Sequence, residues 1–283
     1  FELPAGSINQ GMIRARVIPC LLVTGEATLV KTVGFARAQY IGDPVNTVSI
    51  FNDLEVDEIA ILDIEASRQD REPQFELIRE ITANCFIPLS YGGGVKTIDH
   101  MKRLFDVGVE KIILNTALFS DPDLVSGASE HFGAQAIVAS IDVKQTLLGR
   151  RKVFRRLGQA VKHSRARSEQ TNDLLRSLDF DDPADFARYV QALGVGEIFL
   201  NSVDRDGTFE GYDLDLIRAV VKASDVPVVA CGGAKNFRDL RTPVLQAGAS
   251  AVAAGSIFVY QNQNRSVLVS FPDRSELKEI FAP

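Results

Sequence analysis

The chain has 283 residues, of which 46% are hydrophobic and 24% charged, a composition typical of a globular protein with one large core. Its net charge of −6 argues against nucleic acid as the principal partner. The apolar runs are too short to cross a bilayer and no segment resembles a signal peptide, so we expect a cytoplasmic protein with no membrane partner. Cys20, Cys85 and Cys231 form no CxxC pair and leave an odd count, which fits a reducing compartment.

The first eleven residues differ from the rest of the chain. Residues 1–11 show no periodicity and contain no methionine, whereas Met12 follows them directly. We expect 1–11 to be a non-native remnant or, alternatively, a flexible N-terminus. Residues 12–283 are expected to form a single domain.

Short β-rich runs alternate with amphipathic helical segments along the chain. The expected strands are Arg16 to Leu22, Glu58 to Ile64, Pro88 to Tyr91, Lys111 to Leu114, Ala136 to Ile141, Glu197 to Asn201, Pro227 to Ala230 and Ala251 to Ala254. The expected helices lie near Pro44 to Asn52, Pro73 to Asn84, Ile98 to Asp106, Asp121 to His131, Asp182 to Leu193, Leu214 to Lys222, Phe237 to Ala247 and Arg274 to Phe281. Three of them start with Asp-Pro, a capping carboxylate before a proline suited to the first turn. This order predicts a closed (β/α)8 TIM barrel. An open doubly wound sheet is the alternative, and no dinucleotide fingerprint favours it.

The two halves of the chain repeat each other. Asp63 corresponds to Asn201, 138 residues later, and Gly93 corresponds to Gly232, 139 residues later. The pairs Asn115-Thr116 and Gly255-Ser256 correspond at a separation of 140. The repeat predicts a barrel made of two (βα)4 half-barrels. Leu22 corresponds to Asp142 at a separation of only 120 residues, because the connection after Asp142 is longer than the one after Leu22.

Glycine-rich turns follow the third and seventh expected strands. They contain Gly92, Gly93 and Gly94 in the first half, and Gly232 and Gly233 in the second. Backbone without a Cβ allows amide groups to reach an anion. One such turn is more often structural, but two in register, each with its Asn-Thr or Gly-Ser partner, predict two phosphate cradles. The ligand is therefore expected to carry phosphate at both ends.

The stretch from Gly196 to Tyr212 places a polar loop directly after an apolar strand, where α/β enzymes hold their reactive groups. Asp206 and Gly207 lie in this loop, and Asp63 follows the second expected strand. The two carboxylates are candidates for binding substrate hydroxyls or orienting a base. For Asp206, capping of its own turn is an equal alternative.

Several motifs carry a resemblance to a known family. They are RVIPCLL, VKTVGF, GDPV, DEIAILDIEAS, YGGGV, EKIILNTA, AIVASIDVK, GEIFLNSVDRDGTFEGYD, CGGA and AAGSIF. Over nearly all of Met12 to Phe281 the chain resembles HisF, the cyclase subunit of imidazole glycerol phosphate synthase. The resemblance implies a barrel without a cofactor that pairs with a glutamine amidotransferase and takes ammonia through its interior. It also implies a lyase-type cyclisation of a formimino ribonucleotide in histidine biosynthesis, with aspartates at the ends of strands one and five as general acid and base.

The resemblance fails at one of these two catalytic positions. The fifth-strand aspartate is Asp142, but the first-strand position holds Leu22. Leucine cannot transfer a proton, and such catalysis is typically worth about 10²- to 10⁴-fold, so the cyclase reaction should be impaired. Asn201 also stands where the family usually has threonine.

The motifs CLLV, LVKTVGF, YIGDPVN and FNDLEVDE resemble a paralogous branch more closely. This branch is associated with sugar amidation in surface-polysaccharide (lipopolysaccharide) synthesis, where ammonia passes to a separate sugar amidotransferase. An active histidine-pathway cyclase is one alternative. A non-catalytic scaffold that binds a phosphorylated ligand is another.

Charged residues begin four of the expected strands. Arg16, Glu58, Lys111 and Glu197 match the family's ammonia gate at the amino-terminal face of the barrel, where the glutaminase partner docks. Four solvated charges are the alternative interpretation. Lys31 matches a family lysine on a flexible loop that closes on substrate, although an isolated lysine is more often solvated.

The segment from Lys144 to Ser168 has nine lysines and arginines and no acidic residue. Beside the expected mouth of the barrel it could attract an anionic ligand or an acidic partner surface, or be a solvated loop. His100, His131 and His163 have no metal-ligand spacing, so no metal site is expected. Cys231 is expected to be a small buried residue.

Overall fold

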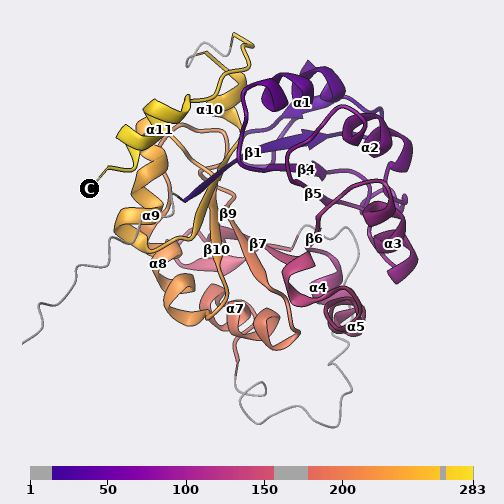
Figure 1. Cartoon of the computed structure of the whole chain (residues 1–283). Helices are drawn as coiled ribbons and strands as arrows, with labels where there is room; N and C mark the ends of the chain where they lie inside the picture. The colour runs from indigo at the N-terminus through magenta and orange to yellow at the C-terminus, as the bar shows by residue number, and fades with distance from the viewer. Residues whose placement is uncertain (1–14, 156–177, 262–265, 283) are drawn as a thin grey trace, which may run out of the picture.

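The computed structural model describes residues 15–155, 178–261 and 266–282. Its parallel strands are β1 (Arg16–Val23), β4 (Ile59–Asp63), β5 (Leu89–Gly92), β6 (Lys111–Leu114), β7 (Ile137–Gln145), β9 (Glu197–Ser202), β10 (Val228–Cys231) and β11 (Ala251–Ala254). β1 pairs in parallel with both β4 and β11, so the ring of strands is closed (Figure 1). The (β/α)8 barrel is thus confirmed. The predictions for residues 1–11, and for the basic segment from 156 to 168, fall outside the described residues.

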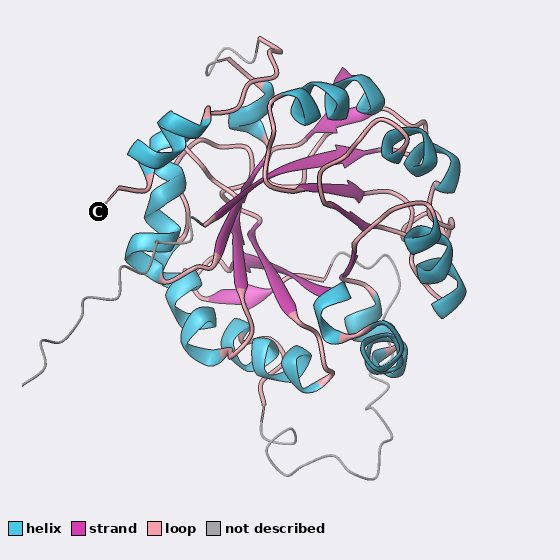
Figure 2. Cartoon of the chain, in the orientation of Figure 1, coloured by secondary structure: helices cyan, strands magenta, loops and turns pink. Residues whose placement is uncertain are grey.

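Helices surround this barrel (Figure 2). They are α1 (Pro44–Asp53), α2 (Phe75–Thr82), α3 (Ile98–Asp106), α5 (Pro122–Phe132), α7 (Pro183–Ala192), α8 (Leu214–Ala223), α9 (Arg241–Ala247) and α11 (Arg274–Ile280). Asp43, Asp121 and Asp182 accept backbone hydrogen bonds at the starts of α1, α5 and α7, as their Asp-Pro sequences predict. The helix expected from Phe237 is instead divided between a 3₁₀ turn (Phe237–Leu240) and α9.

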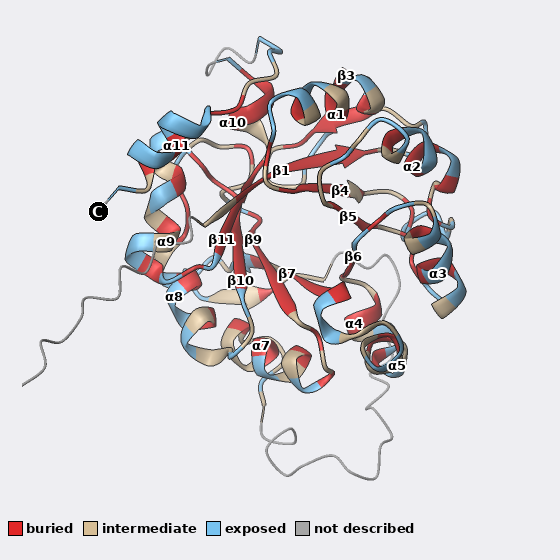
Figure 3. Ribbon diagram, in the orientation of Figure 1, coloured by how far each residue is buried: buried red, intermediate tan, exposed pale blue. Residues whose placement is uncertain are grey.

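Every barrel strand is buried on both faces (Figure 3). On β1, Val17, Leu21 and Val23 pack outward against the helices. Ile18, Cys20 and Leu22 alternate with them and belong to a separate cluster that fills the interior. Because side chains alternate in this way, the position of a residue within its strand decides whether it faces the helices or the interior.

Several short elements have no signal in the sequence pattern. β2 (Leu29–Lys31) pairs antiparallel with β1 and with β3 (Gln39–Gly42), and β8 (Arg151–Val153) pairs antiparallel with β7. Four-residue helices α4 (Ala117–Ser120) and α10 (Ser256–Val259) follow β6 and β11. Each half-barrel therefore has an antiparallel strand after its first strand and a short helix after its fourth. Three or four residues cannot display a hydrophobic period, and barrel strands of the same length, such as β6, are predicted from their place in the alternation of apolar runs and helices.

Candidate functional site

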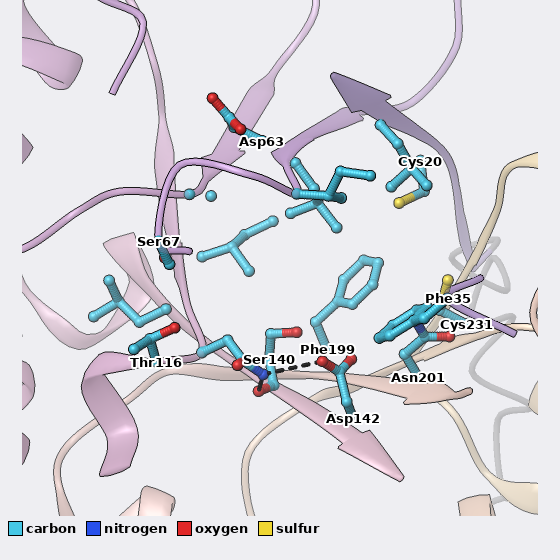
Figure 4. Close-up of a pocket in the computed structure, with 18 of the residues that line it drawn as sticks. Cys20, Phe35, Asp63, Ser67, Thr116, Ser140, Asp142, Phe199, Asn201 and Cys231 are labelled. Atoms are coloured by element: carbon cyan, nitrogen blue, oxygen red, sulfur yellow. Dashed lines mark hydrogen bonds between the residues drawn. The ribbon is translucent and has the colours of Figure 1, made fainter. Parts of the chain in front are cut away.

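A cavity of about 170 Å³ opens at the carboxyl ends of the barrel strands (Figure 4). Residues of β1, β2, β4, β5, β6, β7, β9 and β10 line it, as does the turn after β11. The predicted site residues in its lining are Leu22, Lys31, Asp63, Gly92, Gly93, Gly94, Asn115, Thr116, Asp142, Asn201, Asp206 and Gly255. The cavity therefore contains both predicted acid–base positions and the first predicted phosphate cradle.

A smaller hollow adjoins this cavity. It is lined by the remaining predicted residues, Gly207, Gly232, Gly233 and Ser256, and it shares Asp206 and Gly255 with the cavity. The structure therefore brings all the predicted catalytic and phosphate-binding positions to one end of the barrel, in two adjoining spaces. Each space contains one of the two glycine turns.

The glycine turns use backbone that other residues adopt at a cost. Gly93 has φ +122°, and a Cβ there would lie 2.7 Å from the Cβ of Asp63. Gly232 has φ +90°, and a Cβ there would lie 2.6 Å from Oδ1 of Asn201. Left-handed conformation and close approach both require glycine at these two positions. Both turns can therefore pack directly against the strand beside them, at the ends of β4 and β9.

Asp142 and Leu22 extend into the same cavity from β7 and β1. Asp142 accepts a hydrogen bond of 3.2 Å from Nδ2 of Asn115, which also donates to the carbonyl of Ser140 at 2.9 Å (Figure 4). This bond orients the carboxylate. Leu22 is 8% exposed and offers only an alkyl group at the equivalent position of the first half-barrel.

Asp63 has a role different from the predicted ligand contact. Its side chain is fully buried and accepts from the backbone amides of Glu65 and Ala66 at 3.0 and 2.9 Å. It also accepts from Nε2 of Gln74 at 2.7 Å and from the guanidinium of Arg71 at 3.3 Å. These bonds hold the loop after β4, so the carboxylate is occupied by the protein itself.

The sequence suggested that Lys31 is either on a flexible loop or solvated, and the structure shows neither. Lys31 ends β2, is 5% exposed, and donates from Nζ to the carbonyl of Cys20 at 3.3 Å. Burial raises the pKa of Asp206, while Lys31 and the hydroxyl of Thr32, which donates to Asp206 at 3.3 Å, oppose the rise. Asp206 therefore connects the loop after β9 to Thr32, the residue that follows β2.

Two thiols meet in the wall of the cavity, an arrangement that sequence reasoning missed. Cys20 and Cys231 are both buried and free, and they line the cavity together. A hydrogen bond from Cys231 lowers the pKa of Cys20 against the opposing effect of burial, and the Lys31 ammonium lowers it further. The same hydrogen bond and burial raise the pKa of Cys231. Cys231 is buried as expected, but its pairing with Cys20 becomes visible only once β1 and β10 are placed on either side of β11.

Asn201 has an amide oxygen that no other described residue satisfies. The residue is 8% exposed and lines the cavity, yet its Oδ1 has no hydrogen-bond partner within the described part of the chain. An unmatched buried acceptor costs about 1–3 kcal/mol. A donor group on a bound ligand would remove that cost.

The four charged residues at the opposite end of the barrel form a ring. Arg16 contacts Glu58 and Glu197, and Nζ of Lys111 lies 2.9 and 3.0 Å from the same two carboxylates. Burial lowers the pKa of Arg16, but the attraction of both glutamates prevails and the net pKa is raised. Glu58 and Glu197 are only 4% and 6% exposed, which excludes four separately solvated charges.

Comparison with known proteins identifies the family of this chain. The family model described as histidine biosynthesis protein matches residues 16–264. A Pseudomonas aeruginosa protein named "Putative imidazole glycerol phosphate synthase subunit hisF2" is 44% identical over 266 residues, covering 94% of this chain and 99% of that protein.

Two further relatives cover most of both chains. A Leptospira interrogans protein named "Putative imidazole glycerol phosphate synthase subunit HisF" is 39% identical, covering 95% of this chain and all of its own length. The "Imidazole glycerol phosphate synthase subunit HisF" of Alkaliphilus metalliredigens is 36% identical, covering 88% of this chain and 92% of its own. The chain belongs to the HisF family.

The hairpin of β7 and β8 is the least expected feature of this HisF barrel. The described part of the basic segment lies here, and its charges are paired with acidic residues from elsewhere. Arg150 contacts Asp179 at 3.2 Å, Arg151 contacts Asp213 at 2.7 Å and Lys152 contacts Asp181 at 3.1 Å. These pairs offset the charges of three of the basic residues in the described part of the segment. Arg155, which follows them, lines the main cavity.

Among the described residues of this HisF-family chain, no three His, Cys, Asp or Glu side chains are grouped closely enough to hold a metal ion. The same part of the chain contains no helix with the length and apolar character needed to span a membrane.

Proposed function

We propose that this HisF-family barrel is the ammonia-conducting subunit of a glutamine-dependent complex. A glutamine amidotransferase would dock at the amino-terminal face, release ammonia at the ring of Arg16, Glu58, Lys111 and Glu197, and deliver it through the interior to the cavity. From there the ammonia would pass to a separate sugar amidotransferase in surface-polysaccharide synthesis. A phosphate-bearing ligand would occupy the carboxyl-terminal face.

The observation that carries this proposal is the contrast between the two ends of the barrel. At the entrance the charged ring is complete, with contacts of both cations to both glutamates. At the exit, Leu22 takes the place of one of the two groups that a cyclase needs, opposite an intact Asp142. A chain selected to admit ammonia, but not to use it in a cyclisation, would keep the first and lose the second.

The interior between these ends suits a small neutral molecule. Small and apolar side chains such as Ala60, Ala251 and Ala253 belong to its cluster. Ser90 donates to Glu58 from within the barrel, which gives the ring a polar neighbour on its inner side. An apolar passage admits NH₃ more readily than NH₄⁺, because burial of an unpaired charge is costly.

The amino-terminal face also offers apolar contacts for a partner. Ile50 and Leu54, at the end of α1, and Phe86, ahead of β5, are 43%, 40% and 87% exposed. The amide of Phe86 donates to Oδ1 of Asn52 at 2.8 Å, so these side chains belong to one region of the surface. Exposed apolar groups grouped in this way are typical of an interaction surface.

The first experiment measures glutamine hydrolysis by the amidotransferase partner with and without this chain, and cyclase turnover of this chain alone with the formimino ribonucleotide and excess ammonium. We expect the chain to stimulate hydrolysis and to show little or no cyclase turnover. Robust turnover would contradict the proposal and identify an active histidine-pathway cyclase. Ligand binding without stimulation of the glutaminase would instead identify a ligand-sensing scaffold.

A further inference from the structure

The first half of the barrel places a cation beside the second phosphate cradle. In the β1–β2 hairpin, Leu22 faces Val30, and Lys31 is the next residue. The Nζ atom of Lys31 lies in the space that a side chain at Gly255 would need. Since Gly255 lines both the cavity and the adjoining hollow, the hairpin of the first strand brings its ammonium to the cradle after the eighth strand.

The second half repeats this hairpin with a different residue at its end. In the β7–β8 hairpin, Val143 faces Val153, and the amide of Phe154 donates to the carbonyl of Asp142 at 2.7 Å. Arg155 is the next residue. Because Asp142 is the half-barrel equivalent of Leu22, Arg155 is the equivalent of Lys31.

Sequence spacing hides this equivalence. Lys31 is nine residues after Leu22, whereas Arg155 is thirteen residues after Asp142, because the second hairpin is longer. Only the register of the two hairpins shows that the two cations occupy equivalent positions in the two half-barrels.

Arg155 lines the cavity close to the segment that follows β6, the strand that pairs with β7. Its guanidinium carbon lies 5.1 Å from the centre of the Phe119 ring, and the amide of Phe119 donates to the carbonyl of Thr116 at 3.1 Å. Arg155 and Thr116 line the same cavity as Gly93. This cation–π contact places the guanidinium beside the short helix that follows the end of β6.

The hydrogen-bonding groups of Arg155 are poorly used by the protein. Its Nη2 lies 3.4 Å from the carbonyl of Phe180 and 3.5 Å from Asp181, at the outer limit for a hydrogen bond. Arg151 of the same hairpin, by comparison, binds Asp213 at 2.7 and 2.8 Å. The buried Nε–H of Arg155 has no partner within the described residues. A fork of donors left in this state suits an anion with several acceptor oxygens.

We propose that Arg155 is the cation of the first phosphate cradle, as Lys31 is of the second, and that together with the glycine turn at Gly93 it binds the phosphate monoester of a small-molecule ligand. This inference rests on the phosphorylated ligand of the proposed function. The two cradles are then unequal. Arginine binds phosphate through two parallel hydrogen bonds, whereas the lysine acts as a point charge that Cys20 and Asp206 already engage.

The test is a phosphate titration followed by the amide signals of the two cradles in NMR spectra, at constant ionic strength. Inorganic phosphate and glycerol 3-phosphate are the probes, with glycerol as the uncharged reference. Arg155→Gln should weaken the response of Gly93 and Thr116 at least 10-fold and leave that of Gly233 and Ser256 unchanged. Lys31→Gln should weaken the response of Gly233 and Ser256 at least 10-fold and leave that of Gly93 and Thr116 unchanged.

Arg150→Gln is the matched control. It removes the same charge from the same hairpin, but its side chain is 62% exposed and bound to Asp179. It should change phosphate affinity by less than 2-fold. A loss in Arg150→Gln equal to that in Arg155→Gln would mean that only the general field matters, and the inference would fail.

A second variant separates the inference from the proposed function. If Thr116→Val weakens binding at the first cradle and Arg155→Gln does not, phosphate binds at this cradle and the role proposed for Arg155 is wrong. If the unmodified chain gives no phosphate response at either cradle, both the role of Arg155 and the phosphorylated ligand of the proposed function are wrong. Stimulation of the glutaminase, measured on the same Arg155→Gln protein, tests ammonia delivery independently of both results.

Discussion

Lys31 and Gly255 share one space in the structure. The ammonium nitrogen of the lysine, on β2, lies where the Cβ of any other residue at position 255 would be. Gly255 is therefore a condition for the position of Lys31, although the two residues are 224 positions apart in the chain.

Gly255→Ala should displace Lys31 from the second cradle. The new methyl group would overlap Nζ, break its bond to the carbonyl of Cys20 and overpack the site, at a cost of about 1–3 kcal/mol. Binding of glycerol 3-phosphate at Gly233 and Ser256 should weaken about 10-fold. Urea unfolding and the NMR titration measure the two effects.

The control for this change is Gly127→Ala, in the interior of α5. A Cβ at Gly127 would meet no atom within 4 Å, so the substitution should stabilise the protein by about 0.5–1 kcal/mol through helix propensity. Unchanged phosphate binding in Gly255→Ala would show that Lys31 is not needed at this cradle.

Lys111→Met should destabilise the barrel through the ring at its entrance. The change leaves Glu58 and Glu197, both nearly inaccessible, with Arg16 as their only cation in the ring. Removal of one partner from a buried ionic group costs about 3–5 kcal/mol, and the remaining arginine should hold the loss near the lower value. Urea unfolding at pH 7 gives the free energy.

An exposed ion pair provides the comparison. Arg218→Met removes a cation that contacts Asp215 on the surface of α8, where both side chains are at least half exposed. Such pairs contribute about 0–1 kcal/mol. If Lys111→Met costs no more than Arg218→Met, the ring is solvated in solution and the gate geometry described above is wrong.

Arg151→Met should loosen the hairpin that carries Arg155, with a pH-dependent cost. Burial raises the pKa of Asp213, but hydrogen bonds from Arg151 and from the amide of Leu216 outweigh burial and lower it below 3.8. The ionised pair therefore stabilises the folded chain above about pH 4, and this contribution is lost as the pH falls through the folded-state pKa.

The unfolding free energies of the unmodified chain and of Arg151→Met, compared at several pH values, check this sign. We expect a difference of about 1–3 kcal/mol at pH 7, typical of hydrogen bonds to a charged group, that shrinks below pH 4. A difference that grew toward acidic pH would contradict the assignment. Phosphate binding at Gly93 should weaken as well, because the hairpin positions Arg155.

Leu22→Asp should introduce cyclase turnover at a cost in stability. The new carboxylate would extend into the cavity that contains Asp142, and a positioned acid–base group contributes about 10²- to 10⁴-fold. At a site only 8% exposed, the charge should cost about 2–4 kcal/mol or raise its own pKa. The assay uses the formimino ribonucleotide and excess ammonium.

Leu22→Asn is the matched control, since the amide has the shape of the carboxylate without its proton transfer. Turnover that appears in Leu22→Asp but not in Leu22→Asn would show a site that lacks only this group. Absence of turnover in both would mean that Asn201, or another group of the site, also departs from what the cyclisation needs.

The barrel and most of the site could be predicted from sequence because they depend on periodic or repeated signals. Alternation of apolar runs with capped helices fixed the strand order, and the repeat placed Gly93 and Gly232 at equivalent turns. Side chains in register at the carboxyl ends of parallel strands must converge, so a correct strand order also brings the site together.

The remainder depends on contacts that no local pattern encodes. The burial of Lys31 follows from β2, a strand of three residues, and from the absence of a side chain at Gly255. Asp63 is directed into its own loop by Arg71 and Gln74, which lie eight and eleven residues further on. The role of Arg155 emerges only from the register of β7 with β8.

The ring at the entrance has a consequence for how the barrel assembles. Its four charges come from β1, the start of β4, β6 and β9, and each faces inward only in one alignment with its neighbours, such as Val138 beside Glu197. A slip of one residue would turn a glutamate or its cation outward, into the apolar layer beneath the helices. The ring thus penalises misaligned strands, and we expect it to favour the correct strand register during folding.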